Sequence, residues 1–278
     1  MYKKLLLVIL ILTLLPLNSY ANEVEGDPII IAVIDTGVDI NHDFLKPHLI
    51  EGFNVITKDY KVDDKNGHGT NVTGVIVNTI KDYNVKIMPI KIRSDESDSY
   101  TANSIIEGID YAVEHGADIV NLSLSGEVYS IELKFKIMDY YNEQGIIFVA
   151  SAGNSGENEY LYPASHYEVI SVGATYQKNI AYFSTNNNFV DFVAEGMYIR
   201  TTSTNNRYEV LSGTSFSAPY VSSVIAIMKS INPSLSPKQI EEILIETAND
   251  LGAHGKDNYY GHGFVDIENA INRVKSSK

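Results

Sequence analysis

The chain has no cysteine among its 278 residues, so disulfide bonds and cysteine-ligated metal sites are excluded. Positive charge is scarce too, since 21 Lys and Arg residues stand against 35 Asp and Glu residues and give a formal net charge of −14. Because nucleic-acid binding requires clustered positive charge, this balance argues against a nucleic-acid partner. Stability outside a cell must therefore come from packing or from an ion held by oxygen ligands.

Two catalytic motifs are also absent. No HExxH sequence occurs, and no two histidines have the spacing of metal ligands on a helix, so a zinc enzyme is not indicated. The G-x-S-x-G elbow of the α/β-hydrolases is missing, because Ser217 occupies the place of its second glycine. A lyase or a metal-dependent hydrolase would need ligand clusters that this sequence lacks.

The N-terminal segment has an apolar run that is short for a membrane span, which needs about 20 residues. It also has the three regions of a secretory signal peptide, namely positive charges, an apolar core and small residues before a cleavage site. These are Lys3 and Lys4, residues 5–17, and Ser19 with Ala21. The pattern predicts a signal peptide over residues 1–21, cleavage before Asn22, and a secreted or periplasmic protein with no stable membrane span afterwards. A retained N-terminal anchor is the alternative.

No internal repeat and no low-complexity linker interrupts the rest of the chain. Residues 22–278 are therefore expected to form one domain. Only Asn22 to Pro28 lie between the predicted cleavage site and the first predicted strand, so no propeptide is expected.

Apolar runs alternate with amphipathic stretches from about residue 28 onward. Residues 29–34 (IIIAVI) are continuously apolar, which is typical of a strand buried on both faces. This alternation predicts an α/β fold, with a mostly parallel sheet covered by helices. Ser236 and Gln239 predict a capping box at a helix start. The other predicted strands are residues 85–92, 118–124, 145–151 and 169–174, and the predicted helices are residues 69–81, 101–115, 130–144, 236–248 and 266–274.

Four polar residues follow predicted strands or begin predicted helices, and sites in such sheets lie beyond the carboxyl ends of the strands. They are Asp35 in VIDTGVD, His68 in GHGT, Asn154 in SAGN and Ser215 in GTSFSAP. Each residue alone has a simpler explanation as part of a turn or loop. Ser215 also precedes an amphipathic segment, and the free N–H groups at a helix start favour negative charge.

Taken in this order, the four motifs resemble those of the subtilases, the subtilisin-like serine peptidases. The Asp–His–Ser order is that of subtilisin and differs from the orders of the α/β-hydrolases and the chymotrypsin-like enzymes. The likeness extends over nearly the whole chain after the predicted signal peptide, including NLSLSG and GHGFVDIENAI. It implies a subtilisin-like three-layer fold, with helices on both faces of the sheet.

The resemblance implies that Ser215 is the nucleophile, that His68 is its general base and that Asp35 orients the imidazole. The Asn154 side chain and the Ser215 backbone N–H would form the oxyanion hole. The implied activity is that of a secreted serine endopeptidase that cleaves protein or peptide substrates through an acyl-enzyme intermediate and requires no cofactor. A maturation enzyme that cuts one precursor is a narrower interpretation. A non-catalytic binding module on the same fold is the rival.

The resemblance also places a substrate strand between two backbone edges, above a pocket for P1, the residue that precedes the cleaved bond. The matching positions are Ser99 and Tyr100 for one edge, Ser123, Leu124, Ser125 and Gly126 for the other, and Ala152, Gly153 and Leu161 for the pocket. Subtilisin has a glycine at the position of Leu161, so a shortened pocket and small or medium P1 residues are expected. Nearby acidic residues such as Asp64, Glu96 and Glu157 would favour basic substrates, although a solvated acidic surface is the simpler interpretation.

The sequence departs from the family at the calcium site and after the histidine motif. The strong calcium site of subtilisin is expected to be absent, because Phe44 occupies the position of its aspartate, although Asp43 is adjacent. Acidic loops such as residues 59–64 leave calcium binding open. Asn71 stands where many subtilases have a second histidine, and little catalytic consequence is expected because the position is outside the triad.

Overall fold

The computed structural model describes residues 26–94, 99–127 and 129–277. The predicted signal peptide and the acidic residues 95, 96 and 98 lie outside these ranges. Among the described residues, no helix is both long enough and apolar enough to cross a membrane.

A central sheet organises the chain, with its strands in the order β2-β3-β1-β4-β5-β6-β7 and β8 beside β6. Every pairing in it is parallel except β6 with β7. The strands are β1 (Ile29–Asp35), β2 (Phe53–Asn54), β3 (Val85–Lys91), β4 (Ile119–Leu122), β5 (Ile147–Ser151), β6 (Val169–Tyr176), β7 (Asn179–Ile180) and β8 (Val190–Glu195). A separate antiparallel hairpin contains β9 (Ile199–Ser203) and β10 (Arg207–Leu211).

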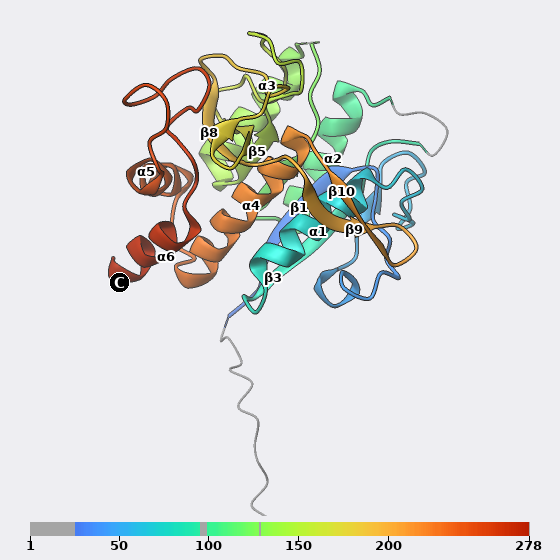
Figure 1. Cartoon of the computed structure of the whole chain (residues 1–278). Coiled ribbons are helices and arrows are strands. Elements are labelled where there is room, and N and C mark those ends of the chain that lie inside the picture. Colours follow the sequence, from blue (N-terminus) through green and yellow to red (C-terminus); the bar gives the residue numbers. More distant parts are fainter. Residues whose placement is uncertain (1–25, 95–98, 128, 278) are drawn as a thin grey trace, which may run out of the picture.

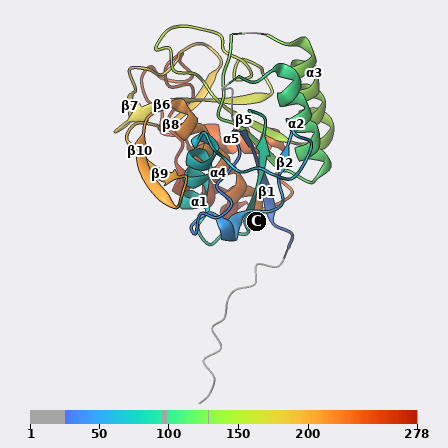
Figure 2. The ribbon, with the colours of Figure 1, turned by 90° about the vertical axis from the view of Figure 1, so that its right-hand side faces the viewer.

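Helices cover both faces of the sheet, as Figures 1 and 2 show from two directions. The longer helices are α1 (His68–Ile80), α2 (Ala102–Glu114), α3 (Ile131–Asp139), α4 (Thr214–Ile231), α5 (Pro237–Thr247) and α6 (Ile267–Ser276), and the short ones are η1 (Lys46–His48) and η2 (Tyr140–Gln144). The apolar core on one face includes side chains of α1, α4, α5 and α6, and the core on the other includes those of α2 and α3. The three-layer, mostly parallel fold predicted from the sequence is therefore confirmed.

The first strand illustrates why its sequence is apolar without interruption. Ile31 and Val33 belong to the core on the α1 and α4 face, whereas Ala32 and Ile34 belong to the core on the α2 and α3 face. Because successive side chains of a strand point to opposite faces, a strand buried on both sides needs apolar residues at every position.

The predicted capping box is also present at the start of α5. The Ser236 N–H donates to Gln239 Oε1 at 2.9 Å, and the Gln239 N–H donates to Ser236 Oγ at 3.3 Å. The prediction for residues 130–144 was less accurate, because α3 ends at Asp139 and continues as the π-helical turn η2. Gly145 then ends this turn with a φ of 70°, a left-handed conformation that glycine adopts without strain.

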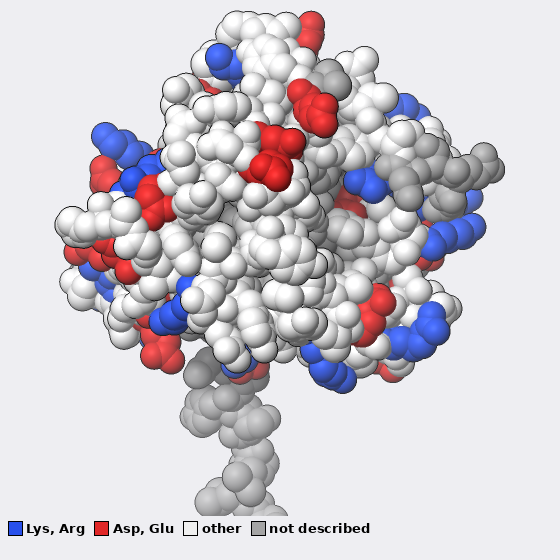
Figure 3. Space-filling view, turned by 45° about the horizontal axis from the view of Figure 1, so that its top comes forward, with Lys and Arg blue, Asp and Glu red and all other residues white. Residues whose placement is uncertain are grey.

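Parallel pairing brings the ends of several strands to one edge of the sheet. Asp35 ends β1, Ser151 ends β5, and the helices α1 and α4 begin near the same edge. Figure 3 turns this part of the molecule toward the viewer and shows a surface whose centre is mostly uncharged, with acidic and basic groups scattered around it.

Candidate active site

Asp35 and His68 form the most closely connected pair at this edge of the sheet. His68 Nδ1 lies 2.8 Å from Asp35 Oδ1 and 2.9 Å from Asp35 Oδ2. The Asp35 side chain is 2% exposed and that of His68 is 27% exposed, so the carboxylate is buried while the imidazole reaches the surface. The carboxylate therefore fixes the ring orientation and leaves Nε2 as the outer nitrogen.

Close packing of backbone holds His68 in this position. A Cβ atom on Gly69 would lie 2.1 Å from the Gly37 carbonyl oxygen, so only glycine permits this approach of α1 to the end of β1. The Gly69 N–H also donates to Thr36 Oγ1 at 2.8 Å. Gly69, the second glycine of the GHGT motif, thus has a steric role.

Electrostatics at His68 favour the protonated ring. Burial disfavours the charged imidazole, but the Coulomb attraction of Asp35 and its hydrogen bond outweigh burial, so the pKa of His68 is raised above 6.5. The same interactions with Asp35 would stabilise the imidazolium that general-base catalysis produces.

Ser215 is the second residue of α4, next to the Asp35–His68 pair. The ring centroids of His68 and Phe216 are 6.2 Å apart, which places the start of α4 beside the imidazole. The Ser215 hydroxyl donates to the Ser123 carbonyl oxygen at 3.4 Å, and no hydrogen bond joins it to His68 in the described part of the chain. Catalytic hydrogen bonds are often long or misaligned before substrate binds.

Asn154 is oriented by the residue that precedes Ser215. Asn154 Oδ1 accepts hydrogen bonds from the Thr214 N–H at 2.9 Å and from Thr214 Oγ1 at 3.0 Å. Because its oxygen is engaged in this way, the Asn154 amide nitrogen remains available to donate toward a developing oxyanion.

Tyr100 and Ser125, which belong to the two predicted substrate edges, are joined by a side chain. The Tyr100 hydroxyl donates to the Ser125 carbonyl oxygen at 2.8 Å. Gly126 is already paired, because it exchanges two backbone hydrogen bonds with Tyr162, at 2.9 and 2.8 Å. Backbone pairing with a substrate on this side would therefore fall to residues 123–125.

The three predicted pocket residues are packed together. Ala152 is buried, and Gly153 has a φ of 111°. Leu161 is 8% exposed, and its Cδ1 would lie 2.3 Å from a Cβ atom on Gly153. The leucine side chain therefore fills the space next to Gly153.

Sequence analysis did not predict two further features of this region. A cavity of about 210 Å³ lies beside the substrate edges, and its lining includes Tyr100, Gly126, Leu133 and Tyr162. Arg93 lies two residues after the end of β3, and its guanidinium lies over the Tyr100 ring, 4.7 Å from the ring centroid. A charged residue shortly after a buried strand was the signal that could have identified Arg93.

Asn71 and Asp64 have structural partners. Asn71 Nδ2 donates to the Thr202 carbonyl oxygen and to Glu209 Oε1, both at 2.7 Å, and so ties α1 to the β9–β10 hairpin. Asp64 is buried and accepts hydrogen bonds from the N–H groups of Asn66, Gly67 and Thr70 and from the Thr70 hydroxyl. Its carboxylate thus orders the loop before His68 and is not free to contact a substrate.

The acidic residues proposed as calcium ligands are engaged in the same way. Asp59 accepts hydrogen bonds from Thr57 and Lys61, and Asp43 accepts one from Asn206 Nδ2 at 2.6 Å. No group of three or more His, Asp or Glu residues in the described ranges could hold a metal ion. Asp43 and Asp59 thus have hydrogen-bond partners within the chain, and no step of the chemistry below involves a calcium ion.

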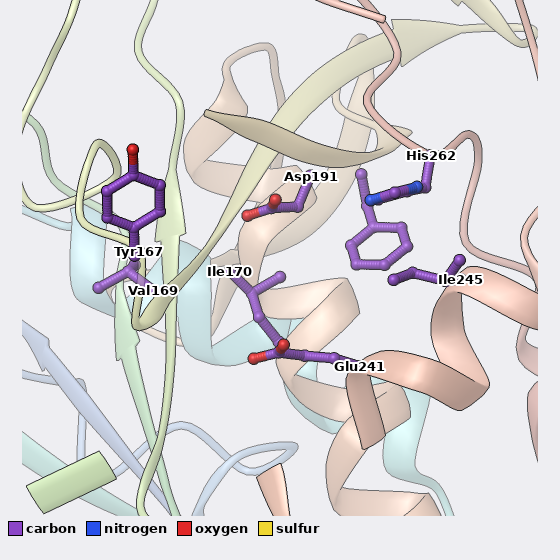
Figure 4. A pocket seen from close by; sticks show the side chains of 8 residues that line it. Tyr167, Val169, Ile170, Asp191, Glu241, Ile245 and His262 are labelled. Carbon is purple, nitrogen blue, oxygen red and sulfur yellow. The ribbon is translucent and has the colours of Figure 1, made fainter. Parts of the chain in front are cut away.

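A cavity of about 100 Å³ lies near the amino ends of β6 and β8, at the opposite ends of those strands from the candidate active site. Figure 4 shows Asp191, Glu241 and His262 around Ile170 there. Lys256 Nζ lies 2.7 Å from Asp191 Oδ1, and the Tyr141 hydroxyl donates to Glu241 at 3.0 Å. Both carboxylates already have protein partners, and the cavity is too small for a peptide.

Comparisons with known proteins agree with this geometry. The sequence profile of the subtilase family matches residues 26–263. Subtilisin DY from Bacillus licheniformis is 35% identical over 258 residues, which cover 88% of this chain and 92% of that protein. The thermophilic serine proteinase of Bacillus sp. (strain AK1) is 34% identical over 250 residues, so that 87% of this chain spans 61% of that protein. The crystal structure of a lanthipeptide protease superposes with a TM-score of 0.81 at 26% identity and covers 90% of this chain and 89% of its own.

Two histidines are predicted to titrate in opposite directions. His68 should titrate above 6.5, whereas burial and the charge of Lys134 lower the pKa of His166 to about 4. In an Asp35→Asn variant the attraction to the imidazolium is lost while burial remains, so the pKa of His68 should fall. The measurement is an NMR titration of the imidazole resonances, assigned with His68→Gln and His166→Gln variants. A His68 pKa that Asp35→Asn leaves unchanged would contradict this account.

Proposed function

This chain belongs to the subtilase family and is a subtilisin-like serine endopeptidase, and from that premise we propose that Asp35, His68 and Ser215 are its catalytic triad. The observation that carries the proposal is the pair of contacts between Asp35 and His68 Nδ1, at 2.8 and 2.9 Å. They leave His68 Nε2 to accept the proton of a nucleophile, and Ser215 lies at the start of the adjacent helix α4.

The proposed reaction begins when the Ser215 hydroxyl turns from the Ser123 carbonyl toward His68. His68 removes its proton as Ser215 Oγ attacks the peptide carbonyl, and Asp35 stabilises the resulting imidazolium. The Ser215 N–H and the Asn154 amide would donate to the oxyanion, and the N-terminus of α4 adds a favourable dipole. His68 then protonates the leaving amine, and water hydrolyses the acyl-enzyme.

Labelling with a fluorophosphonate probe tests the nucleophile. We expect the folded wild-type protein to be labelled, because the probe reacts with an activated serine, and we expect Ser215→Ala to remain unlabelled. Ser217→Ala is the matched control, since Ser217 lies two residues further along α4 and its hydroxyl donates to the carbonyl oxygens of Ala194 and Glu195. A folded wild-type protein that resists the probe would favour the non-catalytic binding module.

The packing of Leu161 against Gly153 supports a shallow P1 pocket. A side chain that occupies this space leaves room for small or medium P1 residues and excludes large aromatic ones. One added or removed methylene changes discrimination by about 10- to 200-fold, so the effect is measurable.

A Leu161→Gly variant should therefore accept larger P1 residues. Profiling on a peptide library is expected to show that the wild type cleaves after small or medium P1 residues. In the variant, cleavage of peptides with Phe or Leu at P1 should increase by at least about 10-fold. Leu124→Ala, in one of the two predicted substrate edges, controls for general loosening of the site. An unchanged P1 profile in Leu161→Gly would show that Leu161 does not limit the pocket.

A narrower proposal is that the natural substrate is a peptide precursor cut at one site. The likeness to a lanthipeptide protease, with a TM-score of 0.81, favours this substrate class over general degradation. The restricted pocket beside Leu161 is consistent with it. The same library separates the two, because a processing enzyme should yield a consensus over several positions.

Export is proposed from the N-terminal pattern, and one curated relative is named a minor extracellular protease of Bacillus subtilis (strain 168). When the full chain is expressed in a Gram-positive host, the protein in the culture fluid should begin at Asn22. Intact mass and N-terminal sequencing measure this. Protein that stays with the membrane and retains residues 1–21 would instead support the anchor.

A further inference from the structure

Arg93 is a half-buried charged side chain close to the predicted active site. The residue before it, Ile92, donates its N–H to the Asp35 backbone carbonyl oxygen at 2.9 Å, so Arg93 follows a residue that is paired with the end of β1. Its Nε is buried and has no hydrogen-bond partner. No carboxylate among the described residues forms an ion pair with it, although a buried guanidinium gains most from a planar anion.

The position of Arg93 coincides with the predicted path of the substrate. Tyr100, over whose ring Arg93 lies, bridges the two predicted substrate edges through its hydrogen bond to Ser125. Arg93 also acts on His68, because its positive charge opposes protonation of that imidazole and lowers its pKa, against the larger effect of Asp35. The guanidinium therefore lies over Tyr100 and is close enough to His68 to act on its charge.

An extended substrate alternates its side chains between two faces. With P1 directed toward Gly153 and Leu161, the preceding residue, P2, points to the other face and toward His68. P4 lies on the same face as P2, two residues further from the cleaved bond, where the cavity beside Tyr100 and Leu133 is available. Arg93 thus faces P2, and the apolar cavity faces P4.

We propose that Arg93 selects substrates with an acidic residue at P2, whose carboxylate would pair with the guanidinium stacked on Tyr100. This inference rests on the proposed endopeptidase function and adds its substrate class. A carboxylate would supply a planar acceptor, which no described residue provides for Arg93 through an ion pair, and a pair shielded by Tyr100 and by the substrate itself is only weakly screened by salt. The preference is opposite in sign to that of an acidic surface that favours basic substrates.

Matched peptides with Asp, Asn or Lys at P2 test the proposal on the purified protein. The remaining positions take the best sequence from the library profile, and kcat/KM is measured for each peptide. For the wild type we expect Asp to exceed Asn by about 10- to 100-fold, the range of a charge-assisted hydrogen bond. Arg93→Gln should cleave both peptides equally, and Arg93→Glu should prefer Lys.

Arg200 provides the matched control, since its guanidinium stacks on Tyr208 at 4.5 Å in the β9–β10 hairpin, away from the predicted substrate edges. Arg200→Gln makes the same change in net charge and should keep the preference for Asp. If Arg93 merely packs on Tyr100, the wild type would cleave the Asp and Asn peptides equally. This comparison uses only the wild type, so it does not depend on whether a variant folds.

Fluorophosphonate labelling of each preparation distinguishes a failure of the role proposed for Arg93 from a failure of the proposed endopeptidase function. A wild-type protein that is labelled and cleaves the Asp and Asn peptides at equal rates overturns the role of Arg93 and leaves the endopeptidase function intact. A folded wild-type protein that is neither labelled nor active overturns both. Labelled wild type with a P2 preference for Asp that Arg93→Glu reverses supports both.

Discussion

The site depends on how closely the start of α1 lies against the end of β1. At Gly69 a side chain would meet the Gly37 carbonyl oxygen at 2.1 Å, so the backbone itself sets the distance between the strand that carries Asp35 and the helix that carries His68. Asp64 completes this arrangement by accepting the N–H groups that begin the helix. Because these contacts exist without substrate, the Asp35–His68 pair is preorganised, and little reorganisation remains for the reaction.

Ser215, the proposed nucleophile, owes its position to a second constraint, the burial of α4. Val224, Ile225 and Ile227 of this helix are fully buried, so α4 is held by the core rather than by a loop. Its first turn is attached to the strand ends, since Thr214 binds Asn154 and Ser123 Oγ donates to the Ser215 carbonyl oxygen at 2.9 Å. A rigid helix positions a reactive group more accurately than a loop does.

Charge near the site differs from the charge of the whole chain. The net charge of −14 suggests an affinity for basic partners. The Asp64 carboxylate, however, is hydrogen-bonded within the chain, and Arg93 is a positive group that adjoins the predicted path of the substrate. A partly buried charge interacts more strongly than solvated surface charges, because the surrounding dielectric is lower. Local pairing, rather than net charge, therefore determines which substrate the site would favour.

Much of this protein was predictable from local sequence. The apolar run of β1, the capping box of α5 and the order of the four motifs identified the sheet, the helices and the residues at its edge, because side-chain periodicity and helix caps depend only on near neighbours. The half-exposed hairpin β9–β10 and the end of α3 were not predicted. The Tyr100–Ser125 bridge, the pairing of Gly126 with Tyr162 and the stacking of Arg93 on Tyr100 were decided by tertiary structure alone. These contacts arise when separate elements pack together, and such packing leaves no periodic pattern in the chain.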